Sequence, residues 1–315
     1  MKLISSHVEP ITFQPLYMER VWGGRELEHR YERALPEHSG PIGEAWEIVD
    51  RPEHQSVIDH GPLKGTTLHE LWTKKRHQIF GDCPDSERFP LLLKILDTRQ
   101  DLSIQVHPPE AIAGELHGEA KNEMWYIIDS LPESKLHVGL RMGVNRDEFT
   151  RAIDRGTVSD CIHTIEAKAG QSILIPSGRL HAIGGGFLIH EIQQNSDTTY
   201  RVHDWDRPDL DGNPRQLHIE ASLRCIDFED IEPTITKGSC DQQCPQFHTV
   251  EHQLEAGESI GNPNPDRFSI ITLLEGILHS KEKRIFSSGV SFILPQGNHL
   301  LTATKSVKLL QTVIP

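Results

Sequence analysis

The sequence lacks most features that mark a secreted, membrane-spanning or disulfide-rich protein. It has five cysteines among 315 residues, no two of which form a Cys-x-x-Cys pair, and the odd count predicts reduced thiols. No stretch approaches about 18 consecutive apolar residues, so a transmembrane helix is not expected. The first residues, MKLISSHVEPITF, contain no apolar core of signal-peptide length. A cytoplasmic location without membrane contact is therefore predicted.

Positive charge is also scarce in this chain. The sequence holds 32 Lys and Arg against 46 Asp and Glu, which gives a formal net charge of −14. Because phosphate backbones bind to basic faces, this balance argues against nucleic acid as a partner. An anionic small molecule would need a few Lys or Arg side chains gathered inside a pocket.

Short strand-like runs, by contrast, are numerous. Two helices are predicted between them, over residues 67–80 and 145–155, each beginning after a capping Thr or Asn, and residues 108–122 are expected to be helical too. The apolar runs are separated by turn residues at spacings typical of an all-β sandwich or barrel. The fold class predicted is mainly β with α-helical insertions, with strands over residues 46–50, 91–96, 124–128, 172–176, 187–192, 269–274, 291–295 and 307–313.

An internal repeat is the most informative pattern in the sequence. Residues 170–181 read GQSILIPSGRLH and residues 289–300 read GVSFILPQGNHL. Both follow the pattern Gly-x5-Pro-x-Gly, which predicts a strand, a tight turn and a return strand. The first copy ends in His181 where the second has Leu300. We therefore expect a duplicated β-barrel with one functional copy and one degenerate copy.

The first copy resembles the second motif of the cupin superfamily, Gly-x5-Pro-x-Gly-x2-His. Gly185 stands where cupins usually carry an Asn after this His. The resemblance implies a duplicated cupin-type β-barrel, or jelly roll. The predicted domains are a catalytic barrel over 1–225, with helical insertions at about 66–81 and 108–122, and a degenerate barrel over 226–315 without a metal site.

The segment LSIQVHPPE, residues 102–110, could form one wall of a metal site. Because side chains alternate along a strand, Ser103, Gln105 and His107 share one face. That face could be solvated, as in a half-exposed sheet, or could line the inside of the barrel. A first cupin motif normally supplies His-x-His and then a Glu, and here Gln105 takes the place of the first His.

The candidate metal ligands are Gln105, His107, Glu123 and His181. Two imidazoles, a carboxylate and an amide oxygen suit Zn²⁺ or a similar divalent ion, with a position left open for water or substrate. Two histidines with one carboxylate are also the ligand set of non-haem iron oxygenases. The residue types alone therefore leave the metal open.

Other apparent motifs do not support a function of their own. HEIQQ at 190–194 lacks the second His of a zinc protease, and GGG at 184–186 lacks the spacing of a dinucleotide-binding loop. The acidic stretch DWDRPDLDGN at 204–213 misses the spacing of a calcium loop, so a solvated loop is predicted there. Cys240 and Cys244 have no second cysteine pair nearby.

Several segments in a fixed order resemble the zinc-dependent type I phosphomannose isomerases in their short bacterial form. The resemblance runs from the N-terminus to about residue 225, and more loosely through LPQGNH at 294–299. It implies the reversible isomerisation of mannose 6-phosphate and fructose 6-phosphate through an enediol, with one Zn²⁺ per chain. The segments are GGREL (23–27), PIGEAWEI (41–48), PLLLKILDTRQDLSIQVHP (90–108), KNEMWYIID (121–129), IPSGRLHAI (175–183) and EIQQNSDTTYRVHDWDR (191–207).

The resemblance also implies roles for individual residues. The family's zinc ligands fall on the four candidates above, and its active-site arginine falls on Arg201. Ile183 replaces an aromatic residue that some relatives carry near the last histidine ligand. The pocket residues implied are Trp22, Glu44, Lys94, Ser103, Lys121 and Glu191.

The isomerisation needs a proton-transfer group, an electrophile at oxygen and donors for the phosphate. Arg201 stays protonated and suits charge stabilisation or substrate binding, whereas Glu191 and Lys121 are both candidates for proton transfer. The phosphate is expected at Ser103 and Lys121, alongside Lys94 or Arg99. Three structural alternatives remain open at this point. Trp22 could be core packing, Lys94 could be a lysine at a strand edge, and Ser103 could be a plain exposed serine.

Other functions remain possible from the residues alone. One is a related isomerase that acts on another sugar or sugar phosphate. Another is a non-catalytic, metal-binding cupin that senses sugars. An iron dioxygenase is disfavoured by Gln105 as a fourth ligand.

Overall fold

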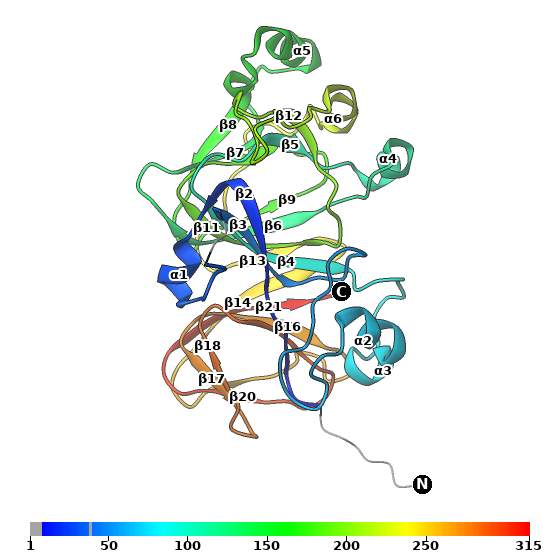
Figure 1. The fold of residues 1–315 in the computed structure, drawn as a ribbon, viewed down its shortest axis with the longest axis vertical. Coiled ribbons are helices and arrows are strands. Elements are labelled where there is room, and N and C mark those ends of the chain that lie inside the picture. Colours follow the sequence, from blue (N-terminus) through cyan, green and yellow to red (C-terminus); the bar gives the residue numbers. More distant parts are fainter. Residues whose placement is uncertain (1–7, 38–39) are drawn as a thin grey trace. The chain divides into compact units, whose positions relative to one another are not determined.

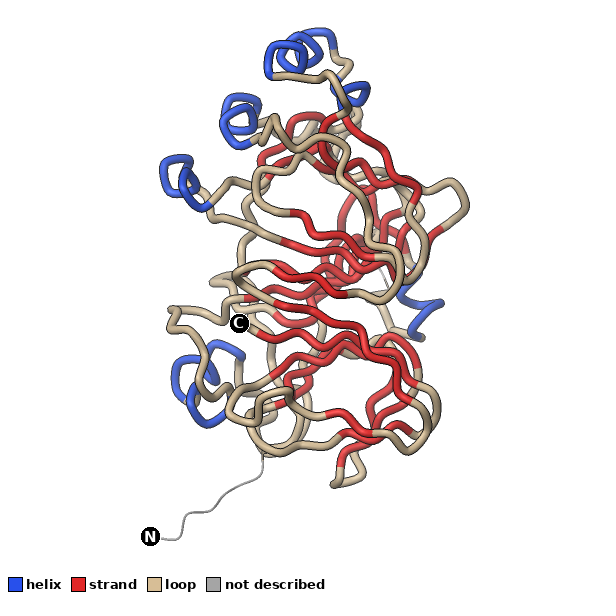
Figure 2. The backbone as a smooth tube through the Cα atoms, turned by 180° about the vertical axis from the view of Figure 1, so that it is seen from behind, coloured by secondary structure: helices blue, strands red, loops and turns tan. Residues whose placement is uncertain are grey.

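The computed structural model describes residues 8–37 and 40–315, which form two compact units built from interleaved parts of the chain. The first unit contains residues up to 16, residues 47–91 and residues 245–315, and the second contains 17–46 and 92–244. Strands dominate both units (Figure 2). Within the described ranges, no helix is long and apolar enough to cross a membrane.

The second unit is built on two sheets. In the larger one β6 (Glu123–Ser130) pairs antiparallel with both β9 (Ser172–Ile175) and β11 (Phe187–Gln194). A short strand, β13 (Asp241–Gln243), also lies in this unit. The larger sheet has the order β2 (Leu16–Gly24), β3 (Ile42–Ile48), β4 (Leu91–Thr98), β11 (Phe187–Gln194), β6 (Glu123–Ser130), β9 (Ser172–Ile175). The smaller sheet has the order β12 (Tyr200–His203), β5 (Ile104–Val106), β10 (His181–Ile183), β7 (Lys135–Leu140), β8 (Ile162–Glu166).

A buried apolar core joins the two sheets of this unit. Trp125 and Ile127 of β6 share one cluster with Leu136 and Val138 of β7. Each strand contributes every second residue to this core because side chains alternate across a sheet. Removing such side chains from water is the main favourable term in folding.

The outer face of the smaller sheet carries a second apolar cluster. Ile104 and Val106 of β5 are buried there with Phe149. Leu102 lies before β5 and joins the core between the sheets instead. Helices lie along this side of the unit (Figure 1). A further helix, α1 (Glu26–Tyr31), comes directly after β2 in the sequence and is not part of this group. The helical segments on this side are α4 (Glu110–Ala113), η1 (Gly114–Leu116), α5 (Arg146–Arg155), η2 (Val158–Cys161) and α6 (Ile219–Cys225).

The first unit repeats this plan with fewer strands. Its core cluster draws on both sheets, for example Ile271 and Leu309 from one and Leu278 and Phe286 from the other. Two helices, α2 (Leu68–Lys74) and α3 (Arg76–Ile79), belong to this unit. One sheet contains β1 (Ile11–Thr12), β19 (Ser291–Leu294), β16 (Ser269–Glu275), β21 (Val307–Val313) and β14 (His248–Leu254), in that order. The other contains β15 (Ser259–Ile260), β20 (Leu301–Ala303), β17 (Ile277–Ser280) and β18 (Ile285–Ser287).

The predicted duplication is confirmed by strand pairing. β9 pairs with β6 as β19 pairs with β16, and β10 pairs with β7 as β20 pairs with β17. The repeated turns also match, because Gly178 and Gly297 both adopt positive φ angles, of 93° and 123°. His181 begins β10, whereas Leu300 precedes β20 and is 62% exposed. The fold is therefore mainly β and duplicated, as the cupin resemblance implies.

The helix predictions are confirmed in two cases and too long in the third. The 67–80 segment forms α2 and α3, with Thr67 and Glu70 closing a capping box, and 145–155 forms α5 after Asn145. The 108–122 segment contains only α4 and η1, because His117 adopts a left-handed conformation that ends the helix. The predicted boundary near residue 225, which would divide the catalytic barrel from the degenerate barrel, stays a prediction.

The turn before His181 gives a prediction about stability. Gly178 has φ +93°, and a Cβ there would lie 3.3 Å from the backbone oxygen of Cys225. Gly178→Ala is therefore expected to lower the free energy of unfolding by about 1–2 kcal/mol. Gly114→Ala is the control, because Gly114 has helical angles and open space around it. Thermal unfolding monitored by circular dichroism measures this. Equal melting temperatures for the two variants would contradict the predicted strain at Gly178.

Candidate active site and metal centre

A cavity of about 610 Å³ lies within the second unit and collects most of the predicted site residues. β5 and β12 contribute Gln105 and Arg201, while the larger sheet contributes side chains from β2, β3, β4 and β11. The three remaining candidate ligands lie deeper and are fully buried. The predicted residues that line the cavity are Trp22, Glu44, Lys94, Ser103, Gln105, Lys121, Glu191 and Arg201.

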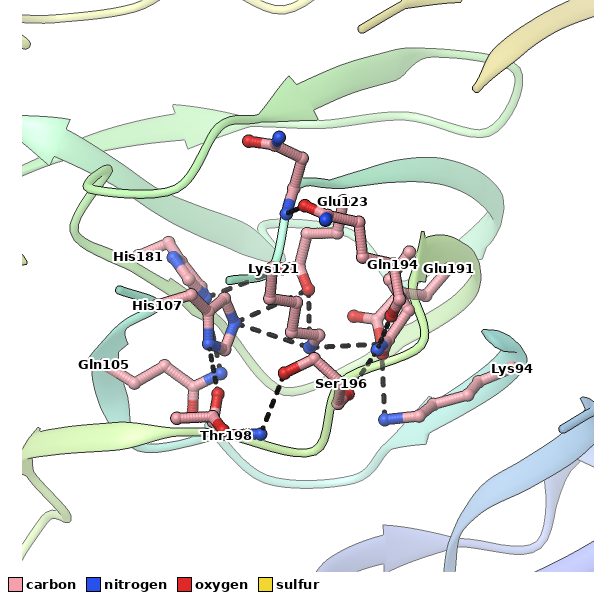
Figure 3. Close-up of polar contacts among 12 residues, drawn as sticks. Lys94, Gln105, His107, Lys121, Glu123, His181, Glu191, Gln194, Ser196 and Thr198 are labelled. Atoms are coloured by element: carbon pink, nitrogen blue, oxygen red, sulfur yellow. Dashed lines mark hydrogen bonds and ion pairs between the residues drawn. The ribbon is translucent and has the colours of Figure 1, made fainter. Parts of the chain in front are cut away.

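His107, Glu123 and His181 form a buried cluster next to this cavity (Figure 3). Their potential ligand atoms lie within 4.8 Å of one another, and the residues are 1%, 0% and 1% exposed. His107 Nε2 is 3.5 Å from Glu123 Oε2, and His181 Nε2 is 3.6 Å from Oε1. These separations are too long for good hydrogen bonds. They leave ligand atoms facing one another around a common point.

Backbone carbonyls fix the orientation of both imidazole rings. His107 Nδ1 lies 2.8 Å from the carbonyl oxygen of Thr198, and His181 Nδ1 lies 2.9 Å from that of Arg179. A carbonyl oxygen can only accept, so each Nδ1 carries the proton and each Nε2 keeps a lone pair. This is the arrangement in which histidines bind metals through Nε2. Ser196 supports the first contact by accepting a hydrogen bond from Thr198 N.

The protonation states in the cluster also suit a cation. Burial, followed by the nearby His107, lowers the pKa of His181 to about 3, and burial with Lys121 lowers that of His107. Burial would raise the pKa of Glu123, but Lys121 and His107 hold it well below its usual range. Neutral imidazoles and an ionised carboxylate are the forms that bind metals. Glu123 Oε1 is buried and accepts no hydrogen bond, so the set fits a divalent cation.

Gln105 lies beside the cluster on the neighbouring strand. It stands opposite His181 in the β5–β10 register, and its Nε2 is 3.3 Å from His181 Nε2. Its Oε1 accepts a hydrogen bond of 3.1 Å from Ser103 Oγ. A half-turn of the amide exchanges oxygen and nitrogen, and Ser103 can serve as donor or acceptor. Gln105 can therefore offer its oxygen as a fourth ligand without moving its backbone.

A chain of alternating charges leads from the cluster into the cavity. Lys121 Nζ lies 2.6 Å from Glu123 Oε2, 3.7 Å from Glu191 Oε1 and 3.4 Å from His107 Nε2. Lys94 Nζ lies 3.5 Å from Glu191 Oε1. The carboxylates and ammonium groups of this chain are buried. Buried charges are tolerated when each is paired in this way.

Glu44 continues this chain toward the edge of the cavity. Its Oε2 lies 3.8 Å from Lys94 Nζ and accepts a 2.6 Å hydrogen bond from Trp46 Nε1. Arg20 Nε donates to its Oε1 at 3.1 Å. Burial alone would raise the pKa of Glu44, but Lys94 and Arg20 lower it to about 2. Glu44 is therefore a fixed negative charge that holds Lys94 in place.

Glu191 differs from the other carboxylates of the chain. Burial and the neighbouring Glu123 raise its pKa, although Lys121 and Lys94 oppose the change. Its Oε2 accepts a hydrogen bond of 3.1 Å from Trp125 Nε1. Burial would lower the pKa of Lys121, but Glu123 and Glu191 raise it above its ordinary value. The pKa of Glu191 is thus raised where those of Glu44 and Glu123 are lowered, while Lys121 stays charged.

The outer part of the cavity contains residues that the sequence did not single out. Arg20 lies on β2, and Arg215 follows a loop that was predicted to be solvated. That loop lines the cavity through Leu210 and neighbouring aspartates. The acidic composition hid this contribution, and no strand or motif pattern indicated it. Arg99, expected near the phosphate, lines a separate cavity and is not part of this site.

Trp22 has both roles that the sequence allowed. It is 3% exposed and packs in the core between the sheets, and it also lines the cavity. Lys94 is buried within β4 rather than at an exposed edge, since it forms ion pairs with Glu44 and Glu191. The buried partner of Lys94 is what a lone cation in an apolar run requires.

Comparisons with known proteins agree with this geometry. The family model of the phosphomannose isomerase type I catalytic domain matches residues 11–133. The chain is 37% identical to mannose-6-phosphate isomerase ManA of Bacillus subtilis over 93% of this chain and 92% of that protein. It is 34% identical to mannose-6-phosphate isomerase of Streptococcus mutans over 93% and 92% of the two chains.

Solved structures show the same architecture. The crystal structure of mannose 6-phosphate isomerase from Bacillus subtilis superposes with a TM-score of 0.88 at 32% identity, covering 98% of this chain and 100% of that one. Mannose 6-phosphate isomerase from Salmonella typhimurium, in its apo form, shares the fold with a TM-score of 0.75 at 16% identity, covering 98% and 99%. With these relatives spanning nearly its whole length, the chain belongs to the type I phosphomannose isomerase family.

Proposed function

We propose that this protein interconverts mannose 6-phosphate and fructose 6-phosphate in the cavity of the second unit. The observation that carries the proposal is the contact between the buried His107–Glu123–His181 cluster and the charged chain that lines the cavity through Lys121 and Glu191. Relatives named mannose-6-phosphate isomerase, similar over nearly their full length, support the choice of substrate.

The metal proposed is one Zn²⁺ per chain, bound by Gln105, His107, Glu123 and His181. Two histidines, a carboxylate and an amide oxygen form the mixed nitrogen–oxygen set of catalytic zinc sites. When bound, such an ion would polarise the sugar's carbonyl oxygen and stabilise the negative charge that develops there. His107 and His181 are then unavailable as bases, so proton transfer must fall to other residues.

Glu191 is proposed as the group that carries a proton between C1 and C2 of the sugar. Its raised pKa lies closer to neutrality than those of Glu44 and Glu123, and catalytic bases work best when their pKa lies near the working pH. Lys121, held charged, would donate hydrogen bonds to the sugar oxygens during enediol formation. Arg201 is proposed to stabilise negative charge on the substrate, since its guanidinium stays protonated.

The remaining predicted residues are proposed to bind and orient the sugar. Lys94 and Glu44 form a fixed ion pair whose free edges can meet hydroxyl groups. Ser103 lies next to Gln105 and can offer its hydroxyl to the substrate. Trp22 supplies an apolar wall at the cavity. A small sugar phosphate is thus the proposed partner, and a cytoplasmic location agrees with five free cysteines.

The nearest alternatives make different predictions about substrates. A related isomerase would turn over glucose 6-phosphate or free mannose better than mannose 6-phosphate, and a sugar-sensing cupin would bind a sugar without turnover. Because relatives named mannose-6-phosphate isomerase match nearly the whole chain, we expect mannose 6-phosphate to give the highest kcat/KM of the three. Coupled assays on each substrate measure this, and negligible turnover of mannose 6-phosphate would exclude the proposed reaction.

Metal removal gives the second test. Chelation should abolish activity, and Zn²⁺ should restore it with about one ion bound per chain. His181→Gln should lower activity by more than the roughly 10–100-fold loss that follows removal of a residue that only orients a metal ligand. His252→Gln on β14 of the first unit is the matched control and should keep both metal and activity. Full activity in metal-free protein, checked by elemental analysis, would contradict the metal site.

The third test concerns Glu191. Glu191→Gln should lower kcat by about 10²–10⁴-fold, as loss of a general base does, with the metal content unchanged. Since Glu191 must begin deprotonated, the wild-type rate should fall as pH drops through its raised pKa, and the variant should lose this acidic limb. Asp197→Asn, an exposed change at the same cavity, is the control. A near-normal kcat in Glu191→Gln would rule out this role.

A further inference from the structure

The cations deep in the cavity are already matched by carboxylates. Lys121 and Lys94 both face Glu191, and each has a second glutamate partner. A phosphate dianion placed there would face those carboxylates at close range. Because like charges in a buried site repel strongly, the inner end suits the neutral sugar better than the phosphate.

Three arginines line the outer part of the same cavity. Arg20 is paired with Glu44, whereas Arg201 and Arg215 have a different environment. Among the described residues, no carboxylate lies within ion-pair distance of the guanidinium of Arg201. Its Nη1 donates to the carbonyl oxygen of Gln216 at 2.9 Å, and its Nε is buried without a hydrogen-bond partner. Burial, and next the positive charge of Arg215, lower the pKa of Arg201. Two guanidinium groups thus lie near each other with their charge only partly compensated.

Asp204 holds Arg215 by one edge of its guanidinium. Arg215 Nε and Nη2 donate to the two oxygens of Asp204 at 2.6 and 2.5 Å, and Asp204 is 7% exposed. Since the other edge of the planar fork has no partner in the described structure, its Nη1 group can serve a ligand. An arginine oriented in this way is well suited to bind a phosphate through two parallel hydrogen bonds.

Two further acidic residues of this loop accept hydrogen bonds from within it. Asp211 accepts hydrogen bonds from the backbone and side chain of Asn213, and Asp209 accepts one from the backbone of Leu210. Asp209 and Asp211 both line the cavity. Their carboxylates accept hydrogen bonds within the turn, and the loop's cation that lines the cavity is Arg215, whose partner Asp204 is shared with Arg207.

We propose that Arg215, positioned by Asp204, binds the phosphate of the substrate together with Arg201 and thereby sets the preference for a phosphorylated sugar. This inference rests on the proposed function, because it takes this cavity as the active site. It assigns the phosphate to the outer loop rather than to Ser103 and Lys121. The sugar's reacting end would then lie toward Gln105, next to the metal cluster.

The chain offers a matched control for this inference. Arg207 donates to the same Asp204 at 3.0 Å from the same loop, but it does not line the cavity. Arg207→Gln and Arg215→Gln therefore each remove one positive charge that is paired with Asp204. Only Arg215→Gln also removes a side chain that lines the cavity. Asp204→Asn keeps both arginines but weakens the contact that orients Arg215.

Steady-state kinetics on the metal-loaded full chain test the proposal. Arg215→Gln should raise KM for mannose 6-phosphate by about 10–100-fold, the loss expected for a charge-assisted hydrogen-bond pair, with kcat within about threefold of wild type. Its kcat/KM for free mannose should be unchanged. Asp204→Asn should raise KM by a smaller factor, Arg215→Lys should restore part of the affinity, and Arg207→Gln should leave KM within about twofold.

Calorimetric titration with inorganic phosphate tests the same site without turnover. Wild type and Arg207→Gln should bind phosphate alike, and Arg215→Gln should bind it at least about tenfold more weakly. An unchanged KM and phosphate affinity in Arg215→Gln, or equal losses in Arg207→Gln, would overturn the inference. If wild type bound phosphate through Arg215 but failed to convert mannose 6-phosphate, the proposed function alone would fall.

Discussion

The site depends on one buried ion pair, between Lys121 Nζ and Glu123 Oε2 at 2.6 Å. Glu123 must stay ionised where burial would neutralise it, and Lys121 supplies the charge that keeps its pKa low. An unpaired buried charge costs several kcal/mol in real proteins, and the next buried acid, Glu191, is paired with both Lys121 and Lys94. The alternation continues to Glu44, and Arg20 at the edge of the cavity completes it. Each charge is tolerated because its neighbour has the opposite sign.

The two-sheet architecture is what brings these charges together. β5, β6 and β10 place Gln105, Glu123 and His181 on the inward side, while Ile104 and Val106 point into the outer cluster beneath the helices. Alternation along a strand thus serves packing on one face and chemistry on the other. The first unit repeats the same strand order, and at the position of His181 it has Leu300. The repeated framework therefore does not require a histidine at this position.

Much of the site was predictable because its residues lie on short regular segments. The polar face of Ser103, Gln105 and His107 followed from strand periodicity, and His181 followed from the glycine and proline spacing of the repeat. The 108–122 segment was predicted to be one helix and is not, since a left-handed residue at His117 ends it. The stretch 204–213 was predicted to be a solvated loop and is largely exposed, but Leu210 also lines the cavity, as does Arg215 just after the stretch. Loop positions carry no periodic signal, so their direction cannot be read from composition.

The sequence by itself determined the class of fold and the duplication, because strand alternation and turn chemistry are local properties of the chain. The four candidate ligands were predicted with the help of the resemblance to cupins and to the isomerase family. Only the tertiary structure decided which charges meet. Glu44 and Glu191 lie far apart in sequence and both approach Lys94. Protonation follows from such neighbours and from burial. The raised pKa of Glu191 and the lowered pKa of Glu44 are therefore properties of the folded cavity, and no pattern in the sequence distinguishes these two glutamates.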